Sequence, residues 1–202
     1  MSPASSKTGF RSPPLAYGLW IGALGGLAVS GFALSQWIAD AQDLKSLRMA
    51  DEAAISTLVV DGLPEGHSAA FYELLGERAA RLSVPDLYSA RQSVREAVRL
   101  DPGSAYAWAH LAYLEAAAPD GRDASIDALR QTIALCRDCD PALSLWRIEF
   151  IAADWWPMPT DLKADAAAQL SRLSALPETE AEARALAVQA SRLGIPLSLT
   201  AE

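Results

Sequence analysis

The sequence predicts an all-α protein in which a single transmembrane helix near the N-terminus precedes a domain of paired helices. Three observations support this prediction. Apolar residues make up 51% of the 202 residues, and much of that share is alanine, which favours closely packed helices over strands. One long segment lacks charged side chains. The rest of the chain divides into helix-length segments separated by turns that contain proline or glycine.

The uncharged segment covers residues 15–39. A helix of about 20 apolar residues crosses the hydrocarbon core of a bilayer, so this segment is long enough to span a membrane. Trp20 and Trp37 lie near its two ends, where indole rings favour the lipid–water interface. Residues 1–14 are polar and contain proline, and we expect them to form a disordered tail.

A cleaved signal peptide is the alternative interpretation of the same segment. Lys7 and Arg11 would supply its positive region, and Ala39 and Ala41 flank Asp40 in the small-x-small pattern of a cleavage site. The apolar core of a signal peptide spans about 7–15 residues. Because the run here is longer, we favour a retained anchor.

Basic residues on either side of the segment bear on its orientation. Lys7 and Arg11 precede it and Lys45 and Arg48 follow it, so the positive-inside rule gives nearly balanced signals. A short basic tail is the easier end to leave in the cytoplasm. We therefore predict a single-pass protein of a bacterial inner membrane, with the N-terminus inside and the C-terminal domain in the periplasm.

Small residues recur at every fourth position within the predicted span, at Gly18, Gly22, Gly26 and Ser30. On a helix they form a smooth stripe that allows close approach of a second backbone. This pattern predicts a helix–helix contact, either with a membrane partner or with a second copy of the chain as a homo-oligomer. The alternative is that glycine is simply common in membrane helices.

Beyond the span, we expect a stalk helix and linker over residues 40–64, a helical domain over 65–195 and a C-terminal tail over 196–202. Apolar spacing and turn residues place the boundaries of the individual helices. The predicted helices cover residues 40–60, 66–82, 85–100, 104–117, 123–137, 142–154, 160–175 and 178–193. Asp123 and Thr160 are expected to be N-caps.

Within this domain, three sets of residues share the spacing of a known repeat. They are Tyr72, Leu75, Gly76 and Ala79; then Ala90, Val94, Ala97, Leu100 and Pro102; then Trp108, Leu111 and Ala112. The spacing resembles that of the tetratricopeptide-repeat family over about residues 69–176. Glu115 departs from the pattern, because the family usually has an aromatic residue there. The resemblance implies an α-solenoid of helical hairpins.

The family generally uses the concave face, lined by the first helix of each hairpin, to hold an extended segment of a partner. Carried over by position, the resemblance implies a lining of Glu73, Glu77, Tyr106, Ala109, Tyr113 and Arg147. Tyrosine supplies contact area at low entropic cost, and Arg147 would contact a carboxylate of the partner. Alternatively, these residues merely face solvent or a neighbouring helix.

Chemistry of other kinds has little support in the sequence. The formal net charge of −8 argues against nucleic-acid binding, which needs a basic surface. His67 and His110 lack companions at metal-ligand spacing, and we interpret His110 as a partly buried structural residue. No catalytic or nucleotide-binding motif is present. We therefore predict neither an enzyme nor a bound cofactor or metal.

Two short motifs carry open alternatives. Cys136 and Cys139 form a CxxC pair at a predicted helix end, interpreted first as a local disulfide, with free thiols or redox exchange as alternatives. Trp155 and Trp156 are adjacent and cannot both face one core from a helix. A loop that folds back into a gap between helices is the preferred interpretation. An exposed indole at a partner surface is the alternative.

These features together predict a membrane-anchored adaptor or scaffold that binds a protein partner in a bacterial envelope assembly. The partner would be an extended peptide or a membrane protein. Surface-polysaccharide biosynthesis or export is the preferred setting, by general layout alone. The alternatives are an accessory subunit of a larger membrane complex, or a chaperone of the cytochrome-maturation or secretion type.

Overall fold

The computed structural model describes residues 38–60 and 62–197. The chain divides into two compact units, residues 1–46 and 47–202. In the first unit the described residues, 38–46, are helical. In the second unit the described residues form helices and connecting loops without any strand. The predicted all-α class is therefore confirmed for the described part of the chain.

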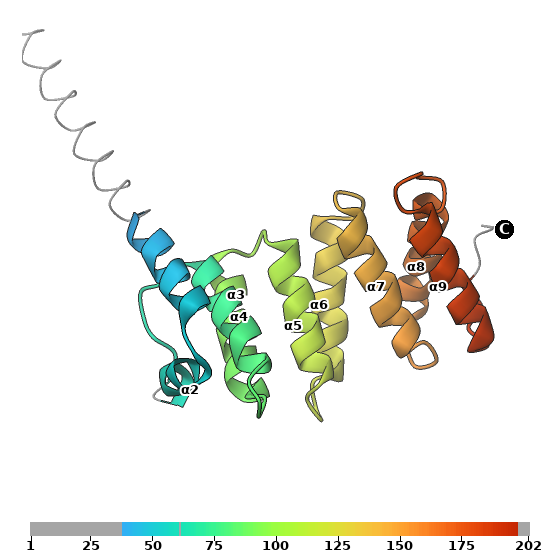
Figure 1. Cartoon of the computed structure of the whole chain (residues 1–202). Helices are drawn as coiled ribbons and strands as arrows, with labels where there is room; N and C mark the ends of the chain where they lie inside the picture. Colours follow the sequence, from blue (N-terminus) through green and yellow to red (C-terminus); the bar gives the residue numbers. More distant parts are fainter. Residues whose placement is uncertain (1–37, 61, 198–202) are drawn as a thin grey trace, which may run out of the picture. The chain divides into compact units, whose positions relative to one another are not determined.

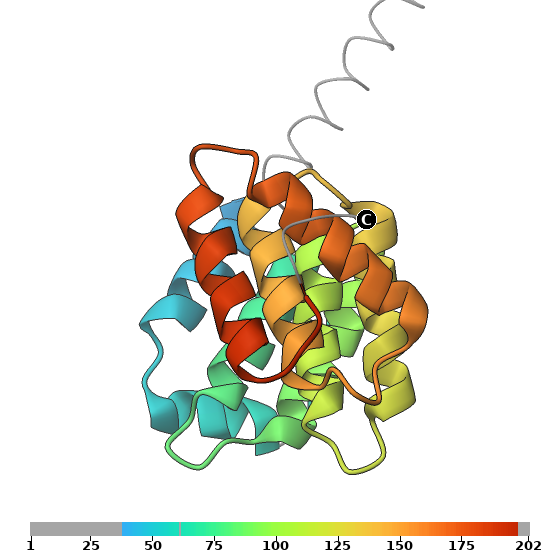
Figure 2. The same cartoon turned by 90° about the vertical axis from the view of Figure 1, so that its right-hand side faces the viewer.

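The second unit is a succession of helices that follow one another in chain order (Figure 1). Its helices are α2 (Glu52–Val60), α3 (Ala69–Ala80), α4 (Leu87–Leu100), α5 (Ala105–Ala116), α6 (Arg122–Leu135), α7 (Pro141–Ala153), α8 (Thr160–Leu173) and α9 (Glu180–Arg192). From α3 to α9, every end lies within three residues of the boundary predicted from the sequence. Helix α3 packs on α4 and α5 on α6, and α4 joins the two pairs by packing on α5. At the other end, α7 packs against both α8 and α9 (Figure 2).

The predicted stalk helix 40–60 is not continuous. Helical structure runs to residue 49 and resumes at Glu52, after a break at Ala50 and Asp51. The Asp51 carboxylate accepts a hydrogen bond from the Ala54 amide at 2.8 Å and so caps the new helix. The Arg78 guanidinium donates to the carbonyl of Arg48 at 3.1 Å and to that of Ala50, which compensates carbonyls freed at the helix end.

The outer boundaries of the helical domain also differ from the prediction. The compact unit begins at residue 47, so α2 belongs to it, and Ile55 and Val59 on this helix are buried. The predicted tail was to begin at residue 196, but Leu197 is buried like Ile195. Apolar side chains that find a packing surface extend the folded unit at both ends.

Hydroxyl and carboxylate side chains cap four further helices. Ser68, Asp86, Ser104 and Asp140 each accept a hydrogen bond from a backbone amide in the first turn that follows. The two predicted caps are wrong. Asp123 lies inside the first turn of α6, which begins after Gly121, and Thr160 is the first residue of α8, preceded by Pro159. Close packing of the α5–α6 turn explains the first case: a Cβ on Gly121 would lie 2.0 Å from the carbonyl oxygen of Glu115.

The close pairing of α3 with α4 depends on small side chains. A Cβ on Gly76 would lie 2.5 Å from Cγ2 of Val94 and 2.9 Å from the carbonyl oxygen of Ala90. Ala79, Ala90 and Ala97 are all fully buried at this crossing. The positions predicted to be small are therefore the ones at which the two backbones approach each other.

No helix among residues 38–60 and 62–197 is both long and apolar enough to cross a membrane. The predicted span, 15–39, lies outside the described residues except for its last two. The predicted helix-packing stripe of Gly18, Gly22, Gly26 and Ser30 also lies outside them.

Candidate functional site

A groove of about 410 Å³ lies across one face of the second unit. Three helices supply its lining, namely α3, α5 and α7, the first helices of successive hairpins. The lining residues are Glu73 and Glu77 from α3, with Arg81 at its C-cap; Tyr106, Ala109, His110 and Tyr113 from α5; and Ala142, Leu143 and Trp146 from α7. Within each helix these residues are spaced by one, three or four positions, which places them on a single face.

The floor of the groove is apolar and rigidly packed. Ala109 and Leu143 are buried and pack with Cys136, and the partly buried ring of Trp146 packs against this cluster. Trp146 in turn stacks on Phe150, with ring centroids 5.1 Å apart. Such a floor presents apolar surface to a partner, and its side chains do not have to rearrange before binding.

Two tyrosines form the rim above this floor. Tyr106 is 51% exposed and Tyr113 54% exposed, so each presents a ring to solvent. The Tyr106 hydroxyl donates a hydrogen bond to the carboxylate of Asp140, the N-cap of α7, which also accepts from the Ala142 amide at 2.8 Å. The bond holds the pKa of Asp140 below its usual range and raises that of Tyr106. Tyr106 thus connects α5 to the beginning of α7.

The charged residues of the groove are not evenly compensated. Glu77 forms an ion pair with Arg81 at 2.6 Å. Glu73 has a pKa raised above its ordinary value, first by burial and then by the like charges of Glu77 and Asp101. Burial is also the main cause that lowers the pKa of His110, which keeps this side chain neutral at neutral pH. Among the residues that the structure describes, no cation pairs with the half-buried carboxylate of Glu73, which lines the groove.

Five of the six residues predicted to line a partner-binding groove lie together in this one. They are Glu73, Glu77, Tyr106, Ala109 and Tyr113. The sixth, Arg147, does not. Its side chain is fully buried, and the neighbouring residue Trp146 takes the place in the groove that the sequence assigned to it.

Arg147 instead anchors the loop between α6 and α7. Its guanidinium donates to the carbonyl oxygens of Cys136 at 2.7 Å, Thr132 at 3.3 Å and Arg137 at 3.4 Å. It also donates to the Ser144 hydroxyl at 3.2 Å. Its expected role as a contact for a partner's carboxylate is corrected on this point, because the carbonyl groups of the loop already use its donors.

Cys136 and Cys139 are joined by a disulfide, with Cα atoms 5.2 Å apart. The bond closes the loop whose carbonyls Arg147 holds, immediately before the Asp140 cap of α7. Because Cys136 also packs against the groove floor, the loop supports the groove from behind.

The paired tryptophans divide between the two interpretations given for them. Trp155 is buried, with Nζ of Lys163 5.5 Å from its ring centroid, and Met158 is buried beside it in the same loop. Trp156 is 71% exposed. The loop therefore folds back through one indole and presents the other to solvent.

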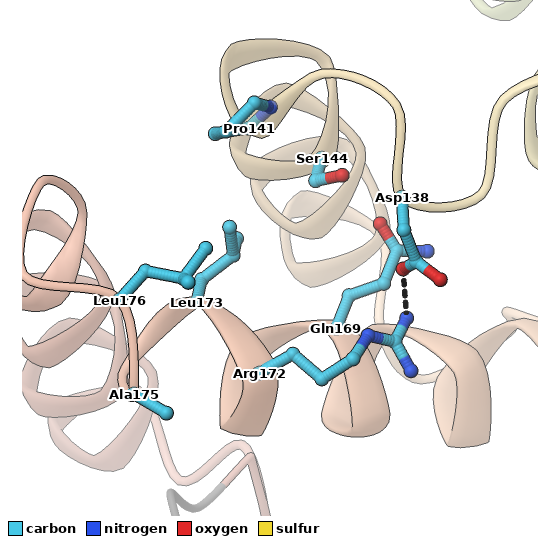
Figure 3. A pocket seen from close by; sticks show the side chains of 8 residues that line it. All are labelled: Asp138, Pro141, Ser144, Gln169, Arg172, Leu173, Ala175 and Leu176. Carbon is cyan, nitrogen blue, oxygen red and sulfur yellow. Dashed lines mark ion pairs between the residues drawn. The ribbon is translucent and has the colours of Figure 1, made fainter.

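A second cavity, of about 310 Å³, lies where α7, α8 and the disulfide loop meet (Figure 3). Pro141 and Leu173 contribute to its apolar wall, and Asp138 pairs with Arg172 at 2.7 Å beside it. Gln169 is buried in the wall, where its amide nitrogen donates to Asp165, while its amide oxygen finds no hydrogen-bond partner within residues 38–60 and 62–197. None of the residues predicted as partner contacts lies here.

Sequence reasoning missed five of the groove residues, Arg81, His110, Ala142, Leu143 and Trp146. A usable signal existed for the first two, because Arg81 follows Glu77 by four positions and His110 precedes Tyr113 by three, as neighbours on a helix face do. The α7 residues were harder to place, because the sequence assigned Arg147 to the groove, whereas the structure buries Arg147 and places Trp146 there.

Comparison with known proteins adds no further constraint: the chain matches no protein-family model, no curated protein and no solved structure. The arrangement of side chains in the groove is therefore the basis for a functional conclusion. It combines an apolar floor, exposed aromatic rings and an uncompensated carboxylate, which together suit binding.

Proposed function

We propose that this chain is a tetratricopeptide-like adaptor, tethered to a membrane by residues 15–39, whose groove holds an extended segment of a protein partner. The observation that carries the proposal is the convergence of five sequence-derived contact residues on one groove of about 410 Å³. A run of first helices that share one open face is the arrangement on which solenoid proteins bind extended segments.

A crosslinking pair tests the groove. A photoreactive phenylalanine analogue replaces Tyr113, 54% exposed in the groove, or Tyr88, 67% exposed on α4. The full chain is irradiated in cells. We expect a discrete crosslinked product from position 113 and none of the same mass from position 88. Equal products from both positions, or none from 113, would contradict groove binding.

The tether is tested separately by fractionation. The full chain is expected to remain with membranes after alkaline carbonate washing, with its N-terminus intact by mass spectrometry. A variant that begins at residue 40 should be soluble. A mature protein that starts after Ala41 would instead identify the segment as a cleaved signal peptide.

A second candidate function is an accessory subunit buried in a larger membrane complex. The exposed indole of Trp156, 71% accessible, favours it, because an indole left in water is a frequent interface anchor. If this alternative holds, Trp156→Ser dissociates a salt-resistant complex in mild detergent while the product from position 113 is unaffected. The envelope pathway, with surface polysaccharides preferred, stays a prediction of the sequence.

A further inference from the structure

We propose that the segment held in the groove carries a lysine or arginine side chain, and that this cation pairs with the carboxylate of Glu73. The proposal rests on the groove function proposed above and adds the chemistry of the partner. It follows from the charges that the groove leaves uncompensated and from the rings that surround them.

The charge of the Glu73 carboxylate is not balanced by the described residues around it. Arg81, the cationic side chain in the lining, is already paired with Glu77 at 2.6 Å. No lysine or arginine in the described part of the chain pairs with Glu73, and the groups that act on it, Glu77 and Asp101, have the same charge. A half-buried carboxylate among like charges is unfavourable, and a cation supplied by a ligand relieves it.

Aromatic side chains share the groove lining with this carboxylate. Tyr106 and Tyr113 present half-exposed rings, and Trp146 lies partly buried in the same lining. Aromatic faces attract ammonium and guanidinium groups. They also pack well against the methylene stems of lysine and arginine, which remain apolar up to the charged end.

The charges of the groove disfavour an acidic partner segment. With His110 neutral, the lining carries two carboxylates and one guanidinium, and the Asp140 carboxylate lies at the rim, bonded to Tyr106. An acidic segment would add like charge to this surface. The lining also extends over three helices, which suits several residues of an extended chain rather than one small cation.

A peptide library provides the test. Full-length protein in detergent micelles is used to select from random dodecapeptides displayed on phage, in parallel with Glu73→Gln, Glu73→Lys and Tyr113→Ala variants. We expect the wild type to enrich peptides with lysine or arginine at one fixed position. Glu73→Gln should lose this preference, and Glu73→Lys should replace it with aspartate or glutamate at the same position.

The possible results separate this inference from the function beneath it. Peptides whose enrichment depends on Tyr113 but that share no basic position, or that share an acidic one, would contradict the pairing of a cation with Glu73. Binding of a peptide in the groove would still be supported. If no peptide is enriched, or if Tyr113→Ala selects the same peptides as the wild type, groove binding itself fails and the inference fails with it.

A double-mutant cycle then measures the pair. An enriched peptide and its counterpart with glutamine in place of the basic residue are titrated against wild type and Glu73→Gln. We expect about a tenfold loss of affinity for either single change and little further loss for both together, as for one charge pair. Glu182→Gln, an exposed glutamate on α9, serves as the matched control and should bind like wild type. Independent, additive losses would contradict the contact.

Discussion

The helices α3–α6 and the helices α7–α9 are held together by different means. In α3–α6, backbones approach closely where side chains are absent or small. A Cβ on Gly76 would come within 2.9 Å of the Ala90 carbonyl oxygen, and one on Gly121 within 2.0 Å of the Glu115 carbonyl oxygen. At these two positions the close approach of the backbones requires the lack of a side chain.

The connection from α6 to α7 depends on a polar side chain. Arg147 bonds the carbonyls at the end of α6, and a disulfide closes the intervening loop. The two connections also differ in how a buried charge is compensated. Glu115 in α5 is paired with Arg95 of α4 at 2.6 Å, so an ion pair accompanies the close packing there, whereas Arg147 donates mainly to carbonyl groups. A similar succession of helices is thus specified by close packing and an ion pair in one part, and by an arginine that binds backbone carbonyls in another.

The largest expected effect is at that anchor. Arg147→Ala removes the donors to the Cys136 and Arg137 carbonyls and leaves a cavity, which should lower the free energy of unfolding by about 3–5 kcal/mol. Urea denaturation followed by circular dichroism measures it. Arg147→Met keeps much of the side-chain volume. It should therefore recover only the part of the lost stability that is due to the cavity.

Arg130, an exposed arginine paired with Asp161, is the matched control. Arg130→Ala should leave the urea midpoint nearly unchanged, because surface pairs contribute little. If Arg147→Ala behaved in the same way, the proposed contrast between the two regions would be wrong.

The next effect is at the close crossing of α3 and α4. Gly76→Ala forces its Cβ against Val94 and the Ala90 carbonyl, and overpacking of this kind costs about 3 kcal/mol at the upper end of its range. Gly103→Ala is the control, since its nearest neighbour would be 3.4 Å away. Adding Val94→Ala to Gly76→Ala should restore part of the loss but not all, because the backbone contact remains. An unchanged melting temperature for Gly76→Ala would show that the close approach of α3 and α4 does not require a glycine at this position.

Gly76 and Arg147 also show how far the sequence could predict the fold. Gly76 and Ala90 were identifiable, because a repeat that brings backbones together needs small residues at fixed spacing. Arg147 was misplaced for a physical reason: a charged residue is normally expected at a surface. Its burial is compensated by the carbonyls of Thr132, Cys136 and Arg137, and the sequence does not show that these carbonyls face inward.

The break in the predicted stalk helix has a similar cause. The apolar spacing continues through Ala50 and Asp51 without glycine or proline, so local sequence favours one helix. The compensating donor for the Ala50 carbonyl is Arg78, 28 residues away. Half of the groove could be predicted, namely five of its ten lining residues, all on α3 and α5, where the helical spacing is regular. Its third side could not, because α7 is positioned by long-range contacts.

A smaller effect is expected on reduction of the disulfide. Its loop contains few residues, with a sequence separation of 3, so chain entropy predicts a loss of about 2 kcal/mol of stability. Hydrogen exchange with and without dithiothreitol locates the change. Amides of α7 should lose protection while those of α3 and α4 keep it. Uniform loss across the unit would mean that the two regions unfold as one and are not separately maintained.

The smallest effect concerns the uncompensated carboxylate in the groove. Burial, and next the charges of Glu77 and Asp101, raise the pKa of Glu73 above its ordinary 4.5. The folded state therefore holds the proton to higher pH than the unfolded state does, and stability is lost as pH rises through the folded pKa. Glu73→Gln removes this loss, so the variant should melt slightly higher than wild type at pH 7 and at the same temperature as wild type below pH 4. A Glu73→Gln variant that melts lower at pH 7 would mean that the carboxylate is already compensated within the fold, and would remove the reason for it to seek a cation from a partner.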